Sequence, residues 1–218
     1  MKTENRKKLY AIGAVLLVAI IPARAQERAH PSVPSASAQT NLPAWFTRGL
    51  PGEGHAALNP LIGDWKQHKS VYGVLGRSPE APPLVSTNIT THREWVAGGH
   101  YIEDFTEGTI DGSPYWRKGW LGYSIMDRRY EWVTIDGINT TMMAYLGNKG
   151  SGVASPIVMT GTFTDQGVLN ENTVGKTVGQ RTVITIENHD RHVIELFFTP
   201  PGGKEQLVDR TIYTRVKK

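Results

Sequence analysis

The sequence predicts an all-β protein: an antiparallel up-and-down β-barrel of about ten strands, with a short helical turn before the first strand. Short runs rich in Val, Ile, Thr, Tyr, Trp and Phe follow one another through residues 65–215. Turn-forming pairs such as Asp111-Gly112 and Asp136-Gly137 separate these runs. No stretch within 65–215 has the length and periodicity that are typical of a helix.

Ten sequential strands would leave two exposed edges unless the sheet closes on itself, and this favours a barrel. The run Gln180–Asn188 has apolar residues on both faces, as expected for a barrel wall whose interior is lined by side chains. A two-sheet sandwich of the Greek-key kind is the alternative. The expected strands are Trp65–Tyr72, Ser86–Trp95, Tyr101–Ile110, Tyr115–Ser124, Tyr130–Ile135, Thr140–Leu146, Ile157–Thr164, Gln180–Asn188, His192–Thr199 and Gln206–Arg215.

The segment before the strands is expected to close one end of the barrel. His55–Leu61 is the predicted helical turn, and Gly63 ends it. Trp65 follows directly and is expected to be a core residue at that end. The folded domain is therefore expected to span residues 51–218, after a flexible leader of residues 26–50 that is rich in Ser, Pro, Ala and Gln.

Residues 1–25 have the pattern of a cleavable signal peptide. Basic residues precede the apolar run Leu9–Ile21, which is too short to span a bilayer comfortably. Ala23 and Ala25 are small residues at the positions that a signal peptidase reads, and Gln26 in place of Cys offers no lipid anchor. We expect a periplasmic or secreted bacterial protein with no stable membrane anchor after cleavage; an uncleaved N-terminal anchor is the alternative.

Charge and cysteine content exclude several classes of function. The chain has 24 basic and 20 acidic residues, and removal of residues 1–25 leaves 19 of each. No basic stripe remains in the mature chain, so nucleic acid is not an expected partner. The chain has no cysteine, which excludes disulfides, thiol chemistry and cysteine-based metal sites.

Several motifs occur in an order that resembles a known family. They are His55–Trp65, Trp95–Asp104, Gly119–Tyr123, Trp132–Asp136, Gly202–Glu205 and Tyr213–Arg215. Together they resemble the bacterial "domain of unknown function 1579" family over residues 51–218. That family is grouped with lipocalin-like and fatty-acid-binding-protein-like (calycin) barrels, so the resemblance implies a closed barrel and brings no established activity. The stretch Val168–Gln180 departs from the family, which tends to have a compact turn there.

No catalytic or metal-binding motif is recognisable. The chain lacks a Gly-x-Ser-x-Gly elbow, a phosphate-binding glycine loop and a His-Glu-x-x-His helix. His189 and His192 are three apart, but they flank a strand turn, so no metal is expected. The predicted ten-strand plan resembles that of nitrobindin-like barrels, which bind haem through a His. In this chain, His192 would be the residue in that role. The segment after Trp65 lacks their glycines, and no cofactor is expected.

Aromatic and cationic residues on the predicted strands are the candidates for ligand binding, since aromatic side chains suit pocket linings. The six candidates are Trp116, Trp120, Trp132, Arg117, Tyr123 and Arg210. The position of Arg210 on the last strand resembles that of an Arg in fatty-acid-binding barrels, which lies inside the cavity near a Tyr. Here Arg210 and Tyr213 have opposite parity, so both cannot point inward.

The strand Tyr115–Ser124 places a cation inside the barrel whichever face is internal. Trp116, Lys118 and Trp120 share one face, and Arg117 lies on the other with Tyr123. A buried cation needs an anionic partner, either a ligand carboxylate or a cross-strand acid. The candidate cross-strand acids are Glu103, Asp104 and Glu131. Glu103 and Asp104 are neighbours with opposite orientations, so they cannot form an acid/base pair, and solvated strand positions are expected for them.

The sequence therefore predicts an exported, non-catalytic binder of a small apolar or amphipathic ligand, with a carboxylate as one option. Two alternatives remain. The first is a structural or partner-binding domain with a filled barrel, and the second is an enzyme with an unrecognised cavity site. A barrel hosts many functions, so the fold alone does not choose among them.

Overall fold

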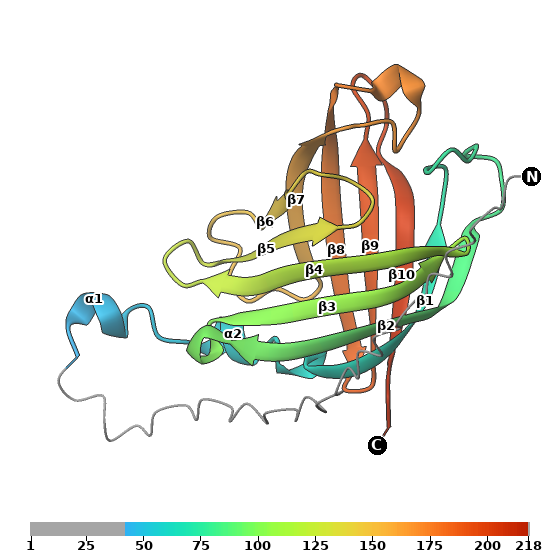
Figure 1. Ribbon diagram of the computed structural model, residues 1–218. Helices are drawn as coiled ribbons and strands as arrows, with labels where there is room; N and C mark the ends of the chain where they lie inside the picture. The colour runs from blue at the N-terminus through green and yellow to red at the C-terminus, as the bar shows by residue number, and fades with distance from the viewer. Residues whose placement is uncertain (1–41, 218) are drawn as a thin grey trace, which may run out of the picture. The chain divides into compact units, whose positions relative to one another are not determined.

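The ten strands of the protein close into one antiparallel barrel. A computed structural model describes residues 42–217 (Figure 1). Each strand pairs with the next in sequence, and β10 pairs with β1 from Trp65↔Arg215 to Val71↔Asp209. This closure confirms the predicted barrel, and the sandwich alternative is wrong. The predicted signal peptide and most of the leader lie outside the described residues.

The strand boundaries agree with the sequence prediction to within three residues. The strands are β1 (Gly63–Val71), β2 (Leu84–Val96), β3 (Tyr101–Ile110), β4 (Ser113–Ser124), β5 (Arg129–Asp136), β6 (Met143–Leu146), β7 (Ile157–Thr164), β8 (Thr177–Asn188), β9 (Arg191–Thr199) and β10 (Gln206–Arg215). The short helices are α1 (Ala44–Thr47), α2 (Glu53–Ala56), η2 (Asn59–Leu61), η3 (Ala97–Gly99) and η4 (Glu171–Thr173). Within residues 42–217, no helix is long and apolar enough to cross a membrane.

One end of the barrel is closed by α2 and η2. Leu58 and Leu61 from this segment are fully buried in the main apolar cluster of the interior. Trp65, also fully buried, donates its indole N–H to the carbonyl oxygen of Leu61 at 2.9 Å. This bond fixes the helical turn over the first strand, and it confirms Trp65 as a core residue at this end.

Strand alternation decides which side chains reach the interior. In β1, Trp65, Gln67, Lys69 and Val71 are buried, while the residues between them are more exposed. In β4, the odd-numbered residues, including Tyr115, face inward. The interior thus receives polar and charged side chains as well as apolar ones.

Loops 72–83, 137–142 and 165–176 meet at the opposite end of the barrel. The backbone N–H of Leu75 donates to the carbonyl of Val168 at 2.8 Å. The side-chain amide of Gln166 donates to the carbonyl of Ile138 at 2.6 Å. Asp165, at the start of the third loop, accepts hydrogen bonds from backbone N–H groups of residues 167–169. These bonds hold the three loops together around the mouth of the barrel.

Candidate functional site

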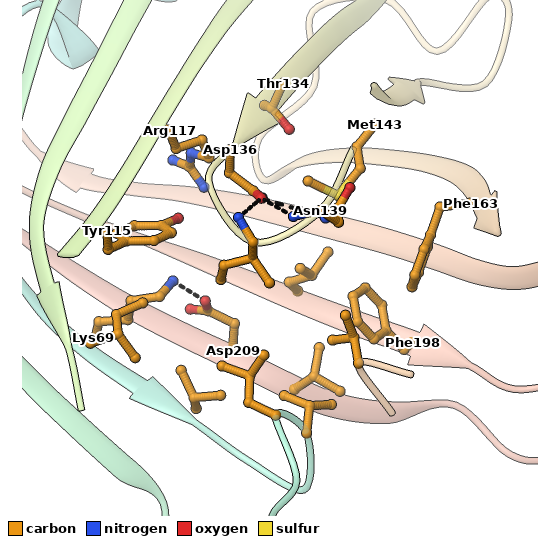
Figure 2. Close-up of a pocket in the computed structure, with 18 of the residues that line it drawn as sticks. Lys69, Tyr115, Arg117, Thr134, Asp136, Asn139, Met143, Phe163, Phe198 and Asp209 are labelled. Atoms are coloured by element: carbon orange, nitrogen blue, oxygen red, sulfur yellow. Dashed lines mark hydrogen bonds and ion pairs between the residues drawn. The ribbon is translucent and has the colours of Figure 1, made fainter. Parts of the chain in front are cut away.

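A cavity of about 100 Å³ lies inside the barrel beneath the three loops (Figure 2). Most of its wall is apolar and comes from strands β1, β3, β6, β7, β9 and β10 and from the loops. The apolar lining residues are Val71, Val74, Leu75, Ile110, Ile138, Met143, Phe163, Val168, Leu196, Phe198 and Val208. The polar lining residues are Lys69, Tyr115, Arg117, Thr134, Asp136, Asn139, Tyr145 and Asp209. The cavity is therefore amphipathic.

A second, outer cavity of about 230 Å³ adjoins the first. The two share four lining residues, Leu75, Ile110, Tyr115 and Ile138. The outer cavity extends toward the turn between β3 and β4. A ligand too large for the inner cavity has room to extend in this direction.

Lys69 and Asp209 form an ion pair at the polar wall of the inner cavity (Figure 2). The Lys69 ammonium also donates to the Thr211 hydroxyl at 3.4 Å, and this hydroxyl donates to the second Asp209 oxygen at 2.7 Å. Burial is the largest single influence on the pKa of Lys69 and lowers it, but the Asp209 carboxylate together with the Tyr115 and Tyr213 phenols outweighs burial, and the pKa ends above its ordinary value. Lys69 is therefore a stable cation and not a base.

Arg117 is the second cation of the cavity wall. Its guanidinium lies 3.5 Å from the Asp104 carboxylate and donates to the Tyr213 hydroxyl at 3.4 Å. It also lies over the Trp132 ring, 5.1 Å from the ring centroid. Burial lowers the pKa of Arg117, yet Asp104 and the neighbouring phenols hold that pKa well above its ordinary value. A ligand carboxylate and a cross-strand acid were the two anionic partners expected for a cation on this strand, and in the structure the partner is the cross-strand acid Asp104.

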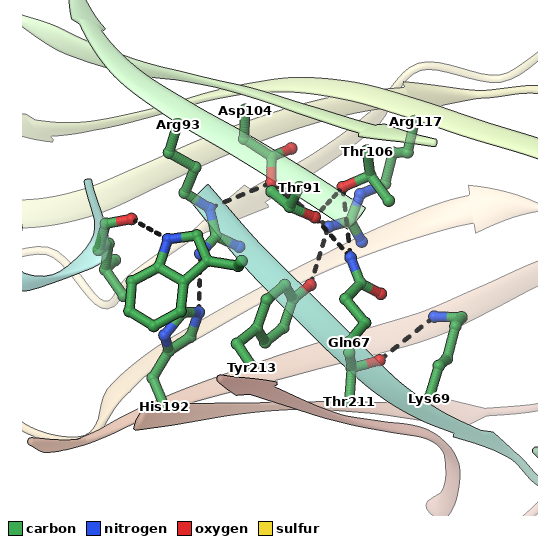
Figure 3. Close-up of polar contacts among 12 residues, drawn as sticks. Gln67, Lys69, Thr91, Arg93, Asp104, Thr106, Arg117, His192, Thr211 and Tyr213 are labelled. Atoms are coloured by element: carbon green, nitrogen blue, oxygen red, sulfur yellow. Dashed lines mark hydrogen bonds and ion pairs between the residues drawn. The ribbon is translucent and has the colours of Figure 1, made fainter. Parts of the chain in front are cut away.

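A belt of buried polar side chains lies between the cavity and the closed end (Figure 3). The Gln67 amide donates to Thr91 at 2.5 Å, and the Thr91 and Thr106 hydroxyls are 2.6 Å apart. Next to them, Arg93 donates to Asp104 at 3.3 Å. Because buried polar groups are costly without partners, these bonds are what allow so many to face the interior.

His192 belongs to this belt and is only 1% exposed. Arg93 lies 2.7 Å from its Nε2, and since arginine can only donate, that nitrogen accepts and the ring is neutral. Tyr213 stacks on one face at 4.4 Å, and Trp65 packs edge-on at 4.3 Å. With Nε2 bonded to Arg93, His192 does not fit an axial haem ligand. His189 is exposed on the turn, so the two histidines do not converge on a metal either.

The phenols at the cavity remain protonated. Burial raises the pKa of Tyr115, and burial likewise raises the pKa of Tyr145 far above its ordinary value. The Tyr145 hydroxyl is directed at the Met143 sulfur at 3.7 Å. The Tyr115 hydroxyl has no hydrogen-bond partner among residues 42–217 and lies at the cavity wall as a donor.

The six residues predicted as ligand contacts are not brought together. Of the six, only Arg117 lines the cavity, and Trp132 packs against the Arg117 guanidinium. Tyr123 lies inside the barrel at the closed end, against His55 and Tyr130. The other three lie on the outer face of the barrel, because their strand positions have outward parity. They are Trp116, which is 43% exposed, Trp120, which donates to Glu103, and Arg210, which pairs with Glu195.

The sequence interpretation missed the strongest polar groups of the interior. Asp104, expected to be solvated, is only 2% exposed. This expectation was wrong because the inward parity of β3 places Asp104 between Arg93 and Arg117. Lys69 was missed as well, although the parity of β1 offered a signal: a core Trp65 places Lys69 on the same inner face.

Comparison with known proteins identifies the family. The family model described as "Protein of unknown function (DUF1579)" matches residues 50–215. The chain belongs to this family. The DUF1579 match covers every strand of the barrel, in agreement with the resemblance seen in the motifs. No curated protein sequence matches the chain.

Two solved structures match most of the chain. Rv2717c from M. tuberculosis is 16% identical, with a TM-score of 0.50 over 76% of this chain and 99% of its own. The S-type phycobiliprotein lyase CPES from Guillardia theta is 12% identical, with a TM-score of 0.47 over 81% of this chain and 99% of its own. At such identities, the similarity to Rv2717c concerns the fold alone.

Proposed function

We propose that this DUF1579 barrel binds a small amphipathic molecule at its open end. The observation that carries the proposal is the composition of the inner cavity, where a broad apolar wall faces a cluster of polar groups that includes Lys69, Tyr115 and Arg117. Ligand sites are commonly of this kind, mostly apolar with a few polar groups that orient the ligand.

The size of the cavity limits the ligand. An engineered cavity of roughly 150 Å³ in another protein binds benzene, so about 100 Å³ suits a short alkyl chain or a part of a larger ligand. The remainder would extend into the outer cavity past Leu75 and Tyr115. We therefore expect ligands with an apolar part of modest length and one polar end.

The test is binding of six- and seven-carbon alcohols, ketones and acids, measured by isothermal titration calorimetry with a cavity-filling variant. Val208 lines the cavity and is 2% exposed, whereas Val158 is 43% exposed on the outer face of β7. Val208→Phe should abolish binding, since the larger side chain occupies the cavity, and Val158→Phe should leave binding unchanged. Leu196→Phe, a second lining position, serves if Val208→Phe is overpacked.

Equal binding by Val208→Phe and the parent, or no binding of any compound, would refute the proposal. A filled barrel with a structural or partner-binding role would then be favoured.

We also propose that the protein is exported. The support is the basic and apolar pattern of residues 1–21 with Ala23 and Ala25 after it. N-terminal sequencing of the protein from its host should give a mature chain that begins at Gln26. A chain that begins at Met1 would refute export by this route.

A further inference from the structure

The charges at and beside the inner cavity balance one another. Three cations, Lys69, Arg93 and Arg117, face three carboxylates, Asp104, Asp136 and Asp209. Asp104 lies between the two arginines, and Asp209 pairs with Lys69. Asp136 is the cross-strand neighbour of Arg117 on β5. No cation at this wall lacks a carboxylate for a neighbour.

The hydrogen-bonding capacity at the wall is less balanced than the charge. Asp209 uses both carboxylate oxygens, for Lys69 and Thr211. One oxygen of Asp136 accepts the backbone N–H groups of Ile138 and Asn139. In contrast, the Tyr115 hydroxyl has no partner among the described residues, and the Lys69 ammonium uses two of its three N–H groups. Donors are therefore left over beside the cavity, and an unbonded acceptor of the same charge cluster, Asp104 Oδ1, is an oxygen of a carboxylate that already carries negative charge.

We propose that the cavity selects ligands whose polar end is an uncharged hydrogen-bond acceptor, such as the carbonyl group of a ketone, ester or amide, over the corresponding carboxylate. This inference rests on the proposed function and names its ligand class. A carbonyl oxygen accepts hydrogen bonds from the unused donors of Tyr115 and Lys69. It leaves the contacts of Asp209 with Lys69 and of Asp104 with the two arginines intact.

A carboxylate would meet a different environment. It would add a fourth negative charge to a site where each cation already has an acidic partner. The carboxylate would lose its hydration on entering the cavity and would find no unpaired cation there. To gain Lys69 it would have to displace Asp209, which would then be the unpaired buried charge. The charge balance thus disfavours a carboxylate ligand, although a buried Arg or Lys taken alone would indicate one.

The test compares 2-heptanone with hexanoate at neutral pH by isothermal titration calorimetry. The two compounds have the same pentyl chain, and a methyl group in the ketone replaces one oxygen of the carboxylate. The parent protein should bind 2-heptanone about tenfold or more tightly than hexanoate, given the cost of burying an unpaired charge. Tyr115→Phe should weaken 2-heptanone binding about fivefold through loss of the donor, and Tyr101→Phe, on the outer face, should not.

Removal of one carboxylate should reverse the preference. Asp209→Asn leaves Lys69 without its counterion, so hexanoate should bind this variant at least as tightly as the ketone. Asp136→Asn tests the same point at a half-buried position if Asp209→Asn does not fold.

The outcomes separate this inference from the proposed function. Hexanoate binding to the parent as tightly as 2-heptanone would overturn the charge-balance inference, as would an unchanged preference in both Asn variants. Cavity-dependent binding of either compound would leave the proposed function standing. Failure of both compounds and of the whole alcohol, ketone and acid series would overturn both.

Discussion

Protonation of His192 should make the stability of the barrel depend on pH. Burial, with Arg93 and Arg215 nearby, lowers the pKa of His192 well below its ordinary value of 6.5. The unfolded chain takes up this proton as the pH falls below 6.5, and the folded protein does not. The stabilising contribution is therefore complete above pH 6.5 and is lost progressively as the pH falls. The loss approaches about 1.4 kcal/mol per pH unit and reaches about 2 kcal/mol at pH 5.

The assay is urea unfolding followed by circular dichroism at pH 8 and pH 5, for the parent and His192→Gln. His55 also has a lowered pKa, caused by burial and by His100. The free energy of unfolding of the parent should therefore fall by more than the contribution of His192 alone. His55 is present in both proteins, and its contribution cancels in the comparison. The variant should lose about 2 kcal/mol less than the parent over this pH range.

His189→Gln, at an exposed turn position, controls for the loss of a histidine as such. If His192→Gln and the parent lose the same free energy of unfolding between pH 8 and pH 5, then His192 is not held neutral in the folded protein. His192 would then not be the neutral hydrogen-bond acceptor for Arg93 in the polar belt.

Further predictions concern the buried ion pairs and the loops at the mouth. Asp104→Asn should lower the free energy of unfolding by about 3–5 kcal/mol in urea titrations, because two buried arginines lose their counterion. Asp64→Asn, the same change in an exposed pair with His92, should cost less than about 1 kcal/mol; equal costs would contradict the burial argument. Asp165→Ala should speed hydrogen exchange of the amides of residues 167–169, and unchanged protection would show that this carboxylate does not hold the loop.

The strands were predictable because their signals are local. Turn pairs such as Asp111-Gly112 and Asp136-Gly137 fall at the ends of β3 and β5, where the chain reverses. Between such turns, β-branched and aromatic residues leave little choice other than strand. Closure of the sheet followed from the number of strands and the need to protect its edges.

The inward face of β4 could not be predicted, because its two faces have similar compositions. Each face has aromatic residues and one cation. Trp120 tolerates the outer face because its indole N–H donates to Glu103 at 2.9 Å, and Lys118 pairs with the same carboxylate at 2.9 Å. Such contacts depend on the register of β3 against β4, and no local pattern reveals it.

The polar wall of the cavity depends on still longer-range pairing. Lys69 on β1 meets Asp209 on β10, and these residues are 140 positions apart in the sequence. The core position of Trp65 does predict that Lys69 faces inward. It does not predict the partner, because closure of the barrel sets the register of β1 against β10.

The most direct measurement of the proposed binding site is a methyl NMR titration with 2-heptanone. Val71, Leu196 and Val208 line the cavity, whereas Leu58 and Ile184 belong to the apolar cluster at the closed end. Binding at the open end should shift the methyl resonances of the first group in a saturable manner and leave those of the second group nearly unchanged. No saturable shift, or shifts confined to the closed end, would contradict a ligand cavity beneath the three loops.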